Sequence, residues 1–469
     1  MRKNIILDKD GYKLSHWKCM PDDLEGAYSY GESRLGLGDD STLVCGLTIP
    51  IHEHLLEPIT QEMIDEAKLE TDSCFGPFNV FNEEVWKKVM KLGYLPLEIK
   101  AVPEGTLLPR GNAKFTVEAT EKWFAPEAQS IESFLMHQYY PTNVSTRAFY
   151  IKRSILPYFK NTSDNLDLLP YAVIDFGVRG ATSFESAAIA GFGHMIHFPG
   201  SDNIPATRAV IKDIYGYQGR LKSVVASEHF VALAFGPNNE LEYVKHMLTK
   251  AVRLDQPVSI VIDAFDQDNF VKNVICHPEI IEIVKQRTGR TIWRPDTGNC
   301  LINIPKYLDI VGATYGWSIN SKDYKVLKEN QGFLQGDGMN RQSIPELYKT
   351  VTECGWSADN VNTGSGGGLL QEGISRDQYR DAIKPSQIIR AGQIIDVQKT
   401  PKSDPSKSSK KGRLKVHPTS RTSFITLESS KETPQSFNSF VDILEPVYIN
   451  GEIIRPNFEN IIKTAEKYL

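Results

Sequence analysis

The sequence predicts an α/β protein in which a TIM-like α/β barrel is joined to a second, α+β domain. The central part of the chain repeats short apolar runs that end in charged residues or glycines and are followed by helix-like segments. Both ends of the chain instead carry short strand-like segments separated by turn signals. With 469 residues, the chain is also too long for one ordinary core, so two domains are expected.

The central repeats predict the strands of the barrel. Buried parallel strands are continuous apolar runs, and strands that alternate with helices indicate an α/β architecture. In barrels of this type the carboxyl ends of the strands form the active face. We therefore expect a barrel over residues 146–384 with polar residues gathered at one face. The six runs are YAVIDFGVRG (171–180), KSVVASEH (222–229), PVSIVIDAFD (257–266), TIWRPDTGN (291–299), GFLQGDG (332–338) and NVNTGSGGG (360–368).

The two ends of the chain predict the second domain. Residues 97–120 are strands broken by PEG and PRGN turns, which favours an antiparallel sheet. Strand and turn signals return in SFITLESS (423–430) and PVYINGEIIRP (446–456). We therefore expect one α+β domain built from residues 1–145 and 385–469.

A basic loop is expected at residues 398–418. It carries Lys399, Lys402, Lys407, Lys410, Lys411 and Arg413 against the single acid Asp404. Composition alone favours a solvated, disordered surface loop. The functional alternative is a mobile basic lid over an anionic substrate.

Composition excludes several classes of protein. The net charge of −5 gives no general reason to expect nucleic acid or an anionic membrane as a partner. Only three consecutive apolar residues precede Asp8, too few for a signal peptide, and no stretch is long enough to cross a bilayer. The six cysteines are far apart, without CxxC spacing, which favours a reduced, cytoplasmic protein.

Polar residues at the predicted strand ends form a candidate site for a phosphorylated sugar or nucleotide. Arginines bind phosphate through a planar fork, glycine N–H groups can approach phosphate closely, and aspartates suit ribose hydroxyls or Mg²⁺. A glycine run is costly to order, so the run 364–368 is either a flexible linker or a backbone that must pass very close to a ligand. The alternative is that each charged pair is a structural salt bridge. The residues are Asp175, Arg179, Glu228, His229, Asp263, Asp266, Arg294, Asp296, Asp337 and the glycine-rich segment 364–368.

Nine stretches, in one order along the chain, resemble the nicotinamide phosphoribosyltransferases, members of the type II phosphoribosyltransferase family. Any one of them alone is a weak signal, whereas the ordered set is specific. They are DGYKLSHWK (10–18), AYSYGESR (27–34), LEIKAVPEGTLLPRGN (97–112), DFGVRG (175–180), SEH (227–229), RPDTGN (294–299), QGDG (335–338), GSGGGLLQ (364–371) and SKKGRL (409–414).

The resemblance implies a reaction of NAD biosynthesis. In it, the 5-phosphoribosyl group of 5-phosphoribosyl 1-pyrophosphate passes to nicotinamide, giving nicotinamide mononucleotide and pyrophosphate. It further implies Mg²⁺, stimulation by ATP through phosphorylation of His229, and a homodimer with active sites shared between subunits. Neither nucleic acid nor a membrane is implied as a partner.

The resemblance also implies roles for individual residues. Those expected to bind nicotinamide are Phe176, Asp202 and Arg179, together with Tyr12 and Asp10, of which Tyr12 comes from the other subunit. Those expected to bind phosphate or ribose are Arg34, Asp337, Gly336, Gly366, Gly367, Arg376, Lys410 and Lys411. Those expected to serve catalysis are His229, Asp296, Arg294 and Asp266, the last also as a Mg²⁺ ligand.

Two positions depart from the family. Ile262 stands where the family has a serine that helps to bind the amide, and Gly332 where it has a basic residue near the phosphates.

Two rival functions remain. The nearest rival is nicotinate phosphoribosyltransferase, on the same barrel. The rival from another class is a catalytically silent binding or signalling protein on the same fold.

Overall fold

The computed structural model describes residues 3–34, 38–76, 78–404 and 407–469, in two compact units. The central unit comprises residues 147–209 and 218–372, and the terminal unit comprises 1–146, 210–217 and 373–468. One boundary falls within helix α6 (Tyr139–Thr162). The other falls at 372–373 rather than at the expected 384–385, because β14 (Ala382–Arg390) pairs with strands of the terminal unit.

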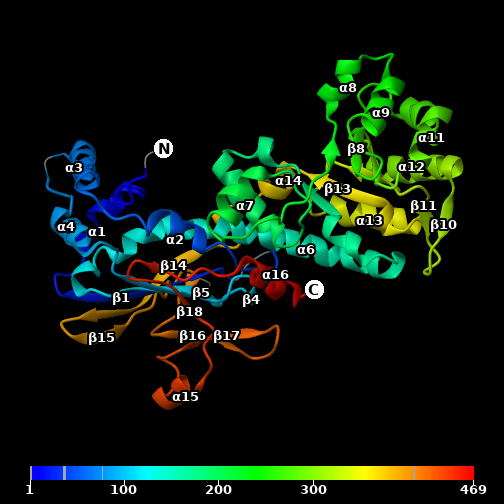
Figure 1. Ribbon diagram of the computed structural model, residues 1–469. Helices are drawn as coiled ribbons and strands as arrows, with labels where there is room; N and C mark the ends of the chain where they lie inside the picture. Colours follow the sequence, from blue (N-terminus) through cyan, green and yellow to red (C-terminus); the bar gives the residue numbers. More distant parts are fainter. Residues whose placement is uncertain (1–2, 35–37, 77, 405–406) are drawn as a thin grey trace. The chain divides into compact units, whose positions relative to one another are not determined.

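The central unit contains a six-stranded sheet (Figure 1). Every neighbouring pair is parallel, and each strand lies within one of the six predicted runs or begins one residue before it. The predicted parallel α/β arrangement is therefore present. As described, it is a sheet with β6 and β7 at its two ends. Its order is β6 (Val173–Asp175), β13 (Val361–Ser365), β12 (Gln331–Gln335), β9 (Thr291–Arg294), β8 (Val258–Val261) and β7 (Val225–Ala226).

Helices follow these strands and pack against them. Helix α9 contacts β8, and α12 contacts both β12 and α13. A small antiparallel hairpin, β10 (Trp317–Ile319) and β11 (Lys325–Leu327), follows α12. The helices are α7 (Phe184–Met195), α8 (His229–Phe235), α9 (Glu240–Thr249), α10 (Gln267–Asn269), α11 (Pro278–Lys285), α12 (Cys300–Tyr315), α13 (Ser343–Glu353) and α14 (Gly367–Leu370), with a π-helical segment at Phe270–Ile275.

The terminal unit contains a seven-stranded antiparallel sheet drawn from both ends of the chain. Strand β1 lies between β14 and β5, so the carboxyl-terminal part of the chain pairs directly with the amino-terminal part. The turn between β18 and β19 places Asn450 and Gly451 at positive φ, as an Asn-Gly hairpin requires. The order is β15 (Gln393–Asp396), β14, β1 (Leu24–Glu32), β5 (Ala113–Ala119), β3 (Leu97–Ala101), β18 (Glu445–Ile449) and β19 (Glu452–Ile453).

Apolar side chains from both chain ends form the core of the terminal unit. Phe115, Ile383 and Tyr448 are buried in one cluster. The remaining strands form two small pairs, β2 (Ser41–Leu43) with β4 (Leu107–Pro109), and β16 (Leu414–Pro418) with β17 (Phe424–Glu428). The helices are α1 (His16–Cys19), α2 (Thr48–His54), α3 (Gln61–Phe75), α4 (Glu83–Leu92), α5 (Glu132–Leu135), α15 (Pro434–Ser439) and α16 (Phe458–Glu466).

The basic segment 398–418 is only partly a loop. Its last residues form β16, in which Leu414 and Val416 are buried in a second core cluster with Tyr28 and Tyr30. The expectation of a loop through residue 418 was therefore wrong at its carboxyl end, because two apolar side chains anchor it there. Lys402, Lys407 and Asp404 precede this strand, while residues 405–406 lie outside the described residues.

Two further expectations bear on the class of protein. Across the described ranges, none of the helices combines the length and apolar character needed to span a bilayer. The six cysteines are all free.

Candidate active site

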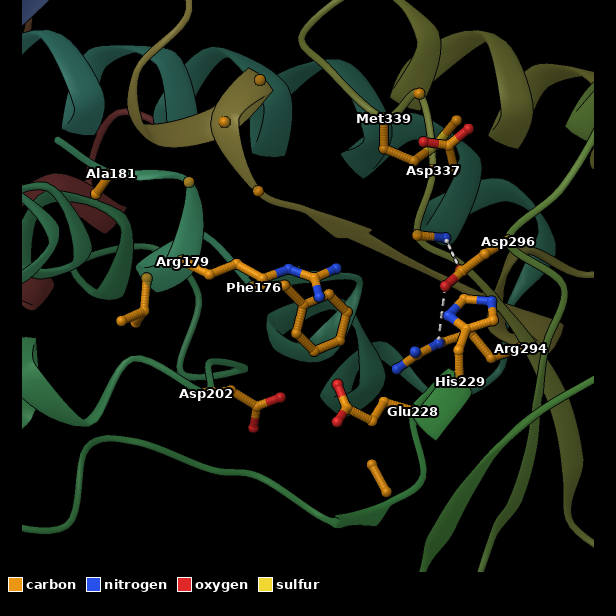
Figure 2. A pocket seen from close by; sticks show the side chains of 18 of the residues that line it. Phe176, Arg179, Ala181, Asp202, Glu228, His229, Arg294, Asp296, Asp337 and Met339 are labelled. Carbon is orange, nitrogen blue, oxygen red and sulfur yellow. Dashed lines mark hydrogen bonds and ion pairs between the residues drawn. The ribbon is translucent and has the colours of Figure 1, made fainter. Parts of the chain in front are cut away.

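A cavity of about 1240 Å³ opens at the carboxyl ends of the parallel strands (Figure 2). Parallel strands end at one edge of a sheet, so residues far apart in sequence meet there. The lining includes Phe176 and Arg179 after β6, Asp202 between β6 and β7, Glu228 and His229 after β7, Arg294 at the end of β9 and Asp296 after it, Gly336 and Asp337 after β12, and Gly366 and Gly367 after β13.

The ring of Phe176 lies against strand β13. Its backbone N–H donates to the carbonyl of Ser365 at 2.9 Å. A Cβ atom added to Gly364 would lie 2.5 Å from the ring atom Cδ2, so only glycine leaves room for the ring at this position. The guanidinium carbon of Arg294 lies 5.8 Å from the ring centroid. The result is an aromatic surface in the cavity with a cation beside it.

Asp175 supports this ring from below and does not line the cavity. Its carboxylate accepts from the Gly177 N–H at 2.7 Å and from the Asn203 amide at 3.0 Å. Burial raises the pKa of Asp175 to about 6. This acid at a strand end therefore fixes the turn that carries Phe176.

Arg294 and Asp296 form an ion pair inside the cavity. Arg294 Nε lies 3.2 Å from Asp296 Oδ2, and Asp296 Oδ1 accepts from the Gly336 N–H at 3.2 Å. Burial raises the pKa of Asp296, and the nearby carboxylate of Asp263 adds to this effect. A Cβ atom added to Gly336 would lie 2.6 Å from Asp296 Oδ1, so the glycine permits this close approach.

The imidazole of His229 contacts the carboxylate of Asp263, which in turn accepts a hydrogen bond from Thr297. Its Nε2 lies 3.1 Å from Asp263 Oδ1, and Thr297 Oγ1 donates to the other oxygen of Asp263 at 2.5 Å. Because a carboxylate accepts hydrogen bonds, Nε2 carries the hydrogen and Nδ1 keeps its lone pair. The Asp263 side chain is 2% exposed and that of His229 48% exposed. The imidazole is therefore both oriented and accessible.

Arg179, Asp202 and Glu228 are exposed charged residues of the cavity. Arg179 extends beside the ring of Phe176, while Asp202 and Glu228 lie on its other side in Figure 2. Asp202 accepts a hydrogen bond from the hydroxyl of Ser223. Acceptors and donors thus surround the ring surface.

The glycines in and after β13 meet different steric requirements. Gly364 makes room for Phe176, and a Cβ on Gly368 would lie 2.9 Å from the Met339 carbonyl oxygen. A Cβ on Gly367 would meet nothing within 4 Å. A side chain at Gly367 would consequently project into the space available to a ligand.

Asp266 and Ile262 also lie outside the cavity lining. Asp266 caps the short helix α10, where its carboxylate accepts from the Asn269 N–H at 2.9 Å. Ile262 is fully buried and lines neither this cavity nor a neighbouring one. The Ile262 side chain packs in the core, and the effect of the missing serine hydroxyl on amide binding stays a prediction.

Gly332 lies far from the phosphate-binding end of its strand. It is near the start of β12, whereas Gly336 follows the end of β12. A Cβ on Gly332 would lie 2.5 Å from Nη2 of Arg290, whose guanidinium fills the vacant space. Arg290 lines a second cavity of about 270 Å³, which shares Phe176 and Asp202 with the first. The expected place of position 332 near the phosphates was therefore wrong.

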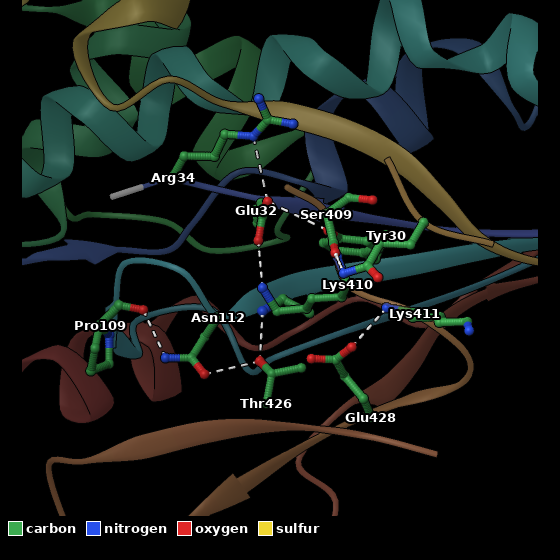
Figure 3. A network of polar contacts seen from close by, with 12 residues as sticks. Tyr30, Glu32, Arg34, Pro109, Asn112, Ser409, Lys410, Lys411, Thr426 and Glu428 are labelled. Carbon is green, nitrogen blue, oxygen red and sulfur yellow. Dashed lines mark hydrogen bonds and ion pairs between the residues drawn. The ribbon is translucent and has the colours of Figure 1, made fainter. Parts of the chain in front are cut away.

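The remaining candidates belong to the terminal unit. Tyr12 is 59% exposed, and its hydroxyl lies 3.5 Å from Asp10 Oδ2. Arg376 pairs with Asp377 at 2.6 Å. The other members, Arg34, Lys410 and Lys411, belong to a polar network around β1 and β16 (Figure 3). Their contribution to the cavity from a second subunit stays a prediction.

Sequence reasoning placed Asp263 among the strand-end candidates without pairing it with His229, and it gave no role to Lys384. Asp263 contacts His229, and both follow neighbouring parallel strands, which is the signal that could have paired them. Lys384 faces Tyr30 across the β1–β14 pair, and burial together with the cations Arg34, Lys399 and Arg376 lowers its pKa. No motif marked Lys384, because its neighbours come from distant segments.

Two family models together match most of the chain. Residues 171–451 match the model of the nicotinate phosphoribosyltransferase family, and residues 4–99 match that of the nicotinamide phosphoribosyltransferase N-terminal domain. These two matches cover most of the strands of the central unit and the beginning of the terminal unit.

Curated relatives match over nearly full length. The chain is 33% identical to nicotinamide phosphoribosyltransferase of Xanthomonas campestris pv. campestris, covering 96% of both chains. It is 29% identical to nicotinamide phosphoribosyltransferase of Mycoplasma genitalium, covering 88% of this chain and 95% of the relative.

Solved structures share the fold at low sequence identity. Human nicotinic acid phosphoribosyltransferase is similar with a TM-score of 0.61 and 13% identity, over 98% of this chain and 93% of that one. Nicotinate-nucleotide pyrophosphorylase of Pyrococcus furiosus is similar with a TM-score of 0.59 and 15% identity, over 100% of this chain and 96% of that one.

Proposed function

The chain belongs to the nicotinate phosphoribosyltransferase family, and from this membership we propose that it is a nicotinamide phosphoribosyltransferase. It transfers the 5-phosphoribosyl group of 5-phosphoribosyl 1-pyrophosphate to nicotinamide, giving nicotinamide mononucleotide and pyrophosphate for NAD biosynthesis. The observation that carries the proposal is one cavity that joins the Phe176 ring to Arg294, Asp296 and Asp202. This arrangement offers a stacking surface, a phosphate binder, a ribose acceptor and an amide acceptor.

The nicotinamide ring stacks on Phe176 and its amide NH₂ donates to Asp202. Arg179, beside the ring, donates to the amide carbonyl. The pyridine nitrogen attacks the anomeric carbon with a free lone pair, so no general base is needed. The polar groups of the cavity therefore have to supply only charge and hydrogen bonds.

The residues around the ring stabilise charge as the ribosyl bond breaks. A ribosyl centre becomes positive while the departing pyrophosphate gains negative charge, and fixed charges aimed at both lower the barrier. Asp296 accepts from ribose hydroxyls, and Arg294 donates to phosphate oxygens. Gly366 and Gly367 leave the 5′-phosphate room to approach the backbone, with Gly336 and Asp337 on the neighbouring strand end.

The available carboxylates fit Mg²⁺ only together with the substrate. Among the described residues, no set of three or more His, Cys, Asp or Glu side chains is placed to hold a metal ion. Mg²⁺ commonly takes one or two carboxylates and completes its shell with phosphate oxygens and water. Asp296 and Asp263, close enough for one to raise the pKa of the other, suit this role, with Asp266 as the further predicted ligand. When bound, Mg²⁺ neutralises charge that develops on pyrophosphate.

His229 accepts a phosphoryl group from ATP in this proposal. Its accessible Nδ1 is the nucleophile, while Asp263 orients the ring through Nε2. The homodimer with shared sites brings Tyr12, Arg376, Lys410 and Lys411 from the other subunit, and Asp10 and Arg34 complete the set of substrate-binding residues. The proposal includes a cytoplasmic location.

A closed TIM-like barrel is part of the same proposal. Isolated parallel bridges join Asp175 to Ser201 and Gly200 to Lys222, between β6 and the segment that leads into β7. These bridges support closure through an irregular segment at residues 200–201.

The charge of Asp202 favours nicotinamide over the rival substrate nicotinate. A nicotinate carboxylate about 4 Å from Asp202 would be repelled by roughly 4 kcal/mol at an effective dielectric constant near 20. Asp202 is exposed, so screening by water reduces this value considerably. The sign still favours the neutral amide.

Product analysis tests the proposed function. The purified protein is incubated with 5-phosphoribosyl 1-pyrophosphate, Mg²⁺ and either nicotinamide or nicotinate, and products are identified by mass spectrometry. Nicotinamide mononucleotide is the expected product. Formation of nicotinate mononucleotide alone would favour the sister enzyme. No product with either base would favour a binding or signalling protein.

A further inference from the structure

Glu32 is a buried carboxylate placed between two cations of the terminal unit (Figure 3). It is 4% exposed and lies at the end of β1. Its Oε2 accepts from Lys410 Nζ at 2.6 Å, and its Oε1 lies 3.5 Å from Arg34 Nε. The side chains of both cations are 15% exposed. One acid therefore contacts two largely buried cations that come from opposite ends of the chain.

The backbones beside both cations are fixed. The N–H of Lys410 donates to the Tyr30 hydroxyl at 2.7 Å, and its Nζ lies 5.3 Å from the centre of the Tyr30 ring. The N–H of Arg34 donates to the Tyr379 carbonyl at 3.0 Å, and its own carbonyl accepts from Arg110 Nε at 2.9 Å. Glu32 consequently controls only the direction of the two side chains.

The same place carries more positive than negative charge. Nε and Nη2 of Arg34 are buried without a hydrogen-bond partner among the described residues. Burial lowers the pKa of Lys384, and the cations Arg34, Lys399 and Arg376 lower it further against one opposing acid, Glu132. Buried guanidinium N–H groups without acceptors are costly, and a phosphoryl group supplies acceptor oxygens with compensating charge.

We propose that Glu32 is a positioning residue that sets Arg34 and Lys410 side by side to bind the pyrophosphate group of the ribosyl donor. This inference rests on the proposed function for the identity of the anion. Without the carboxylate, two like charges repel and a flexible lysine side chain gains many conformations. The cations would then have to be ordered by the ligand at the moment of binding.

An argument from charge alone and the proposed positioning role predict opposite changes in pyrophosphate affinity for Glu32→Gln. Glu32→Gln removes a negative charge from an anion site, so charge alone would strengthen the binding of pyrophosphate. Positioning predicts weaker binding, because glutamine cannot hold two cations. The direction of the change therefore separates the two effects.

The test is calorimetric titration of the full-length protein with inorganic pyrophosphate, before and after Glu32→Gln. We expect affinity to fall on the order of 10-fold, the scale of one hydrogen bond to a charged group. In steady-state assays the KM for the ribosyl donor should rise by a similar factor, with the KM for nicotinamide unchanged. Unchanged or tighter pyrophosphate binding would overturn the proposal.

Glu118→Gln is the matched control. Glu118 pairs with Arg413 at 2.7 Å, so its loss also frees a cation of the basic segment but touches neither Arg34 nor Lys410. Pyrophosphate binding should stay at the parent value. An equal loss in this variant would contradict the proposal, because the effect would then follow from a loosened segment.

Glu32→Asp covers the case in which Glu32→Gln does not fold. It keeps the charge but withdraws the carboxylate by one carbon–carbon bond, so positioning predicts weaker binding and charge alone predicts no change. Pyrophosphate binding does not require turnover. A protein that makes no nicotinamide mononucleotide yet loses pyrophosphate affinity on Glu32→Gln would refute the proposed function and uphold the role of Glu32.

Discussion

Gly364→Ala should damage the nicotinamide site through a single methyl group. The added Cβ would lie 2.5 Å from Cδ2 of Phe176, whereas carbon atoms in contact prefer about 3.5 Å. The ring must therefore move by roughly 1 Å, or strand β13 must shift. Overpacking of this kind typically costs about 1–3 kcal/mol in free energy of unfolding.

Two assays measure this effect. Thermal unfolding should show a lower midpoint, and the KM for nicotinamide should rise on the order of 10-fold, because the displaced ring no longer stacks. The KM for the ribosyl donor should change less. In the background of Phe176→Leu the same alanine should cost less stability, because the ring it strikes is gone. Parent values of stability and KM in Gly364→Ala would refute the described placement of the ring.

Three further predictions concern the charged residues. Arg294→Ala should lower kcat on the order of 10²-fold or more, since it removes a preorganised contact to phosphate, and activity within a few-fold of the parent would make Arg294 structural. His229→Ala should abolish ATP hydrolysis and Asp263→Asn should weaken it, whereas unchanged hydrolysis in His229→Ala would reject the phosphohistidine. Inactive Tyr12→Ala and Arg179→Ala homodimers should recover some activity when mixed, because one site of a mixed dimer carries neither lesion. Absence of recovery in dimers shown to exchange subunits would place Tyr12 elsewhere.

The parallel sheet was predictable because its signal is local. Strand β8 is the short apolar run VSIV (258–261), and charged residues or glycines follow it and the neighbouring strands. Those end residues meet at one edge whatever the loops between them do. For this reason Arg294, His229 and Gly366 could be placed at one cavity from the sequence.

The sequence could not predict whether Asp263 or Asp266 contacts His229, because the turn after β8 decides it. Asp263 and Asp266 both follow β8, yet one contacts His229 and the other caps α10. The resemblance selected Asp266 for catalysis, while the geometry places Asp263 beside the imidazole. The irregular backbone between β8 and α10 decides which carboxylate points where.

Contacts between side chains on different strands were also hidden from the sequence. Gly332 lies opposite Ile292 in the β12–β9 register, so Arg290, two residues earlier, reaches the space above the glycine. The two positions are far apart in sequence and carry no shared motif. Only the register of the sheet relates them.

Base choice tests the central claim most directly. Equal concentrations of nicotinamide and nicotinate compete for a limiting amount of 5-phosphoribosyl 1-pyrophosphate, with the parent protein and with Asp202→Asn, and the two mononucleotides are quantified by chromatography. The account predicts that nicotinamide mononucleotide predominates with the parent and that the ratio narrows in the variant, because the like charge facing nicotinate is removed. Equal use of both bases by the parent, or an unchanged ratio in Asp202→Asn, would contradict it.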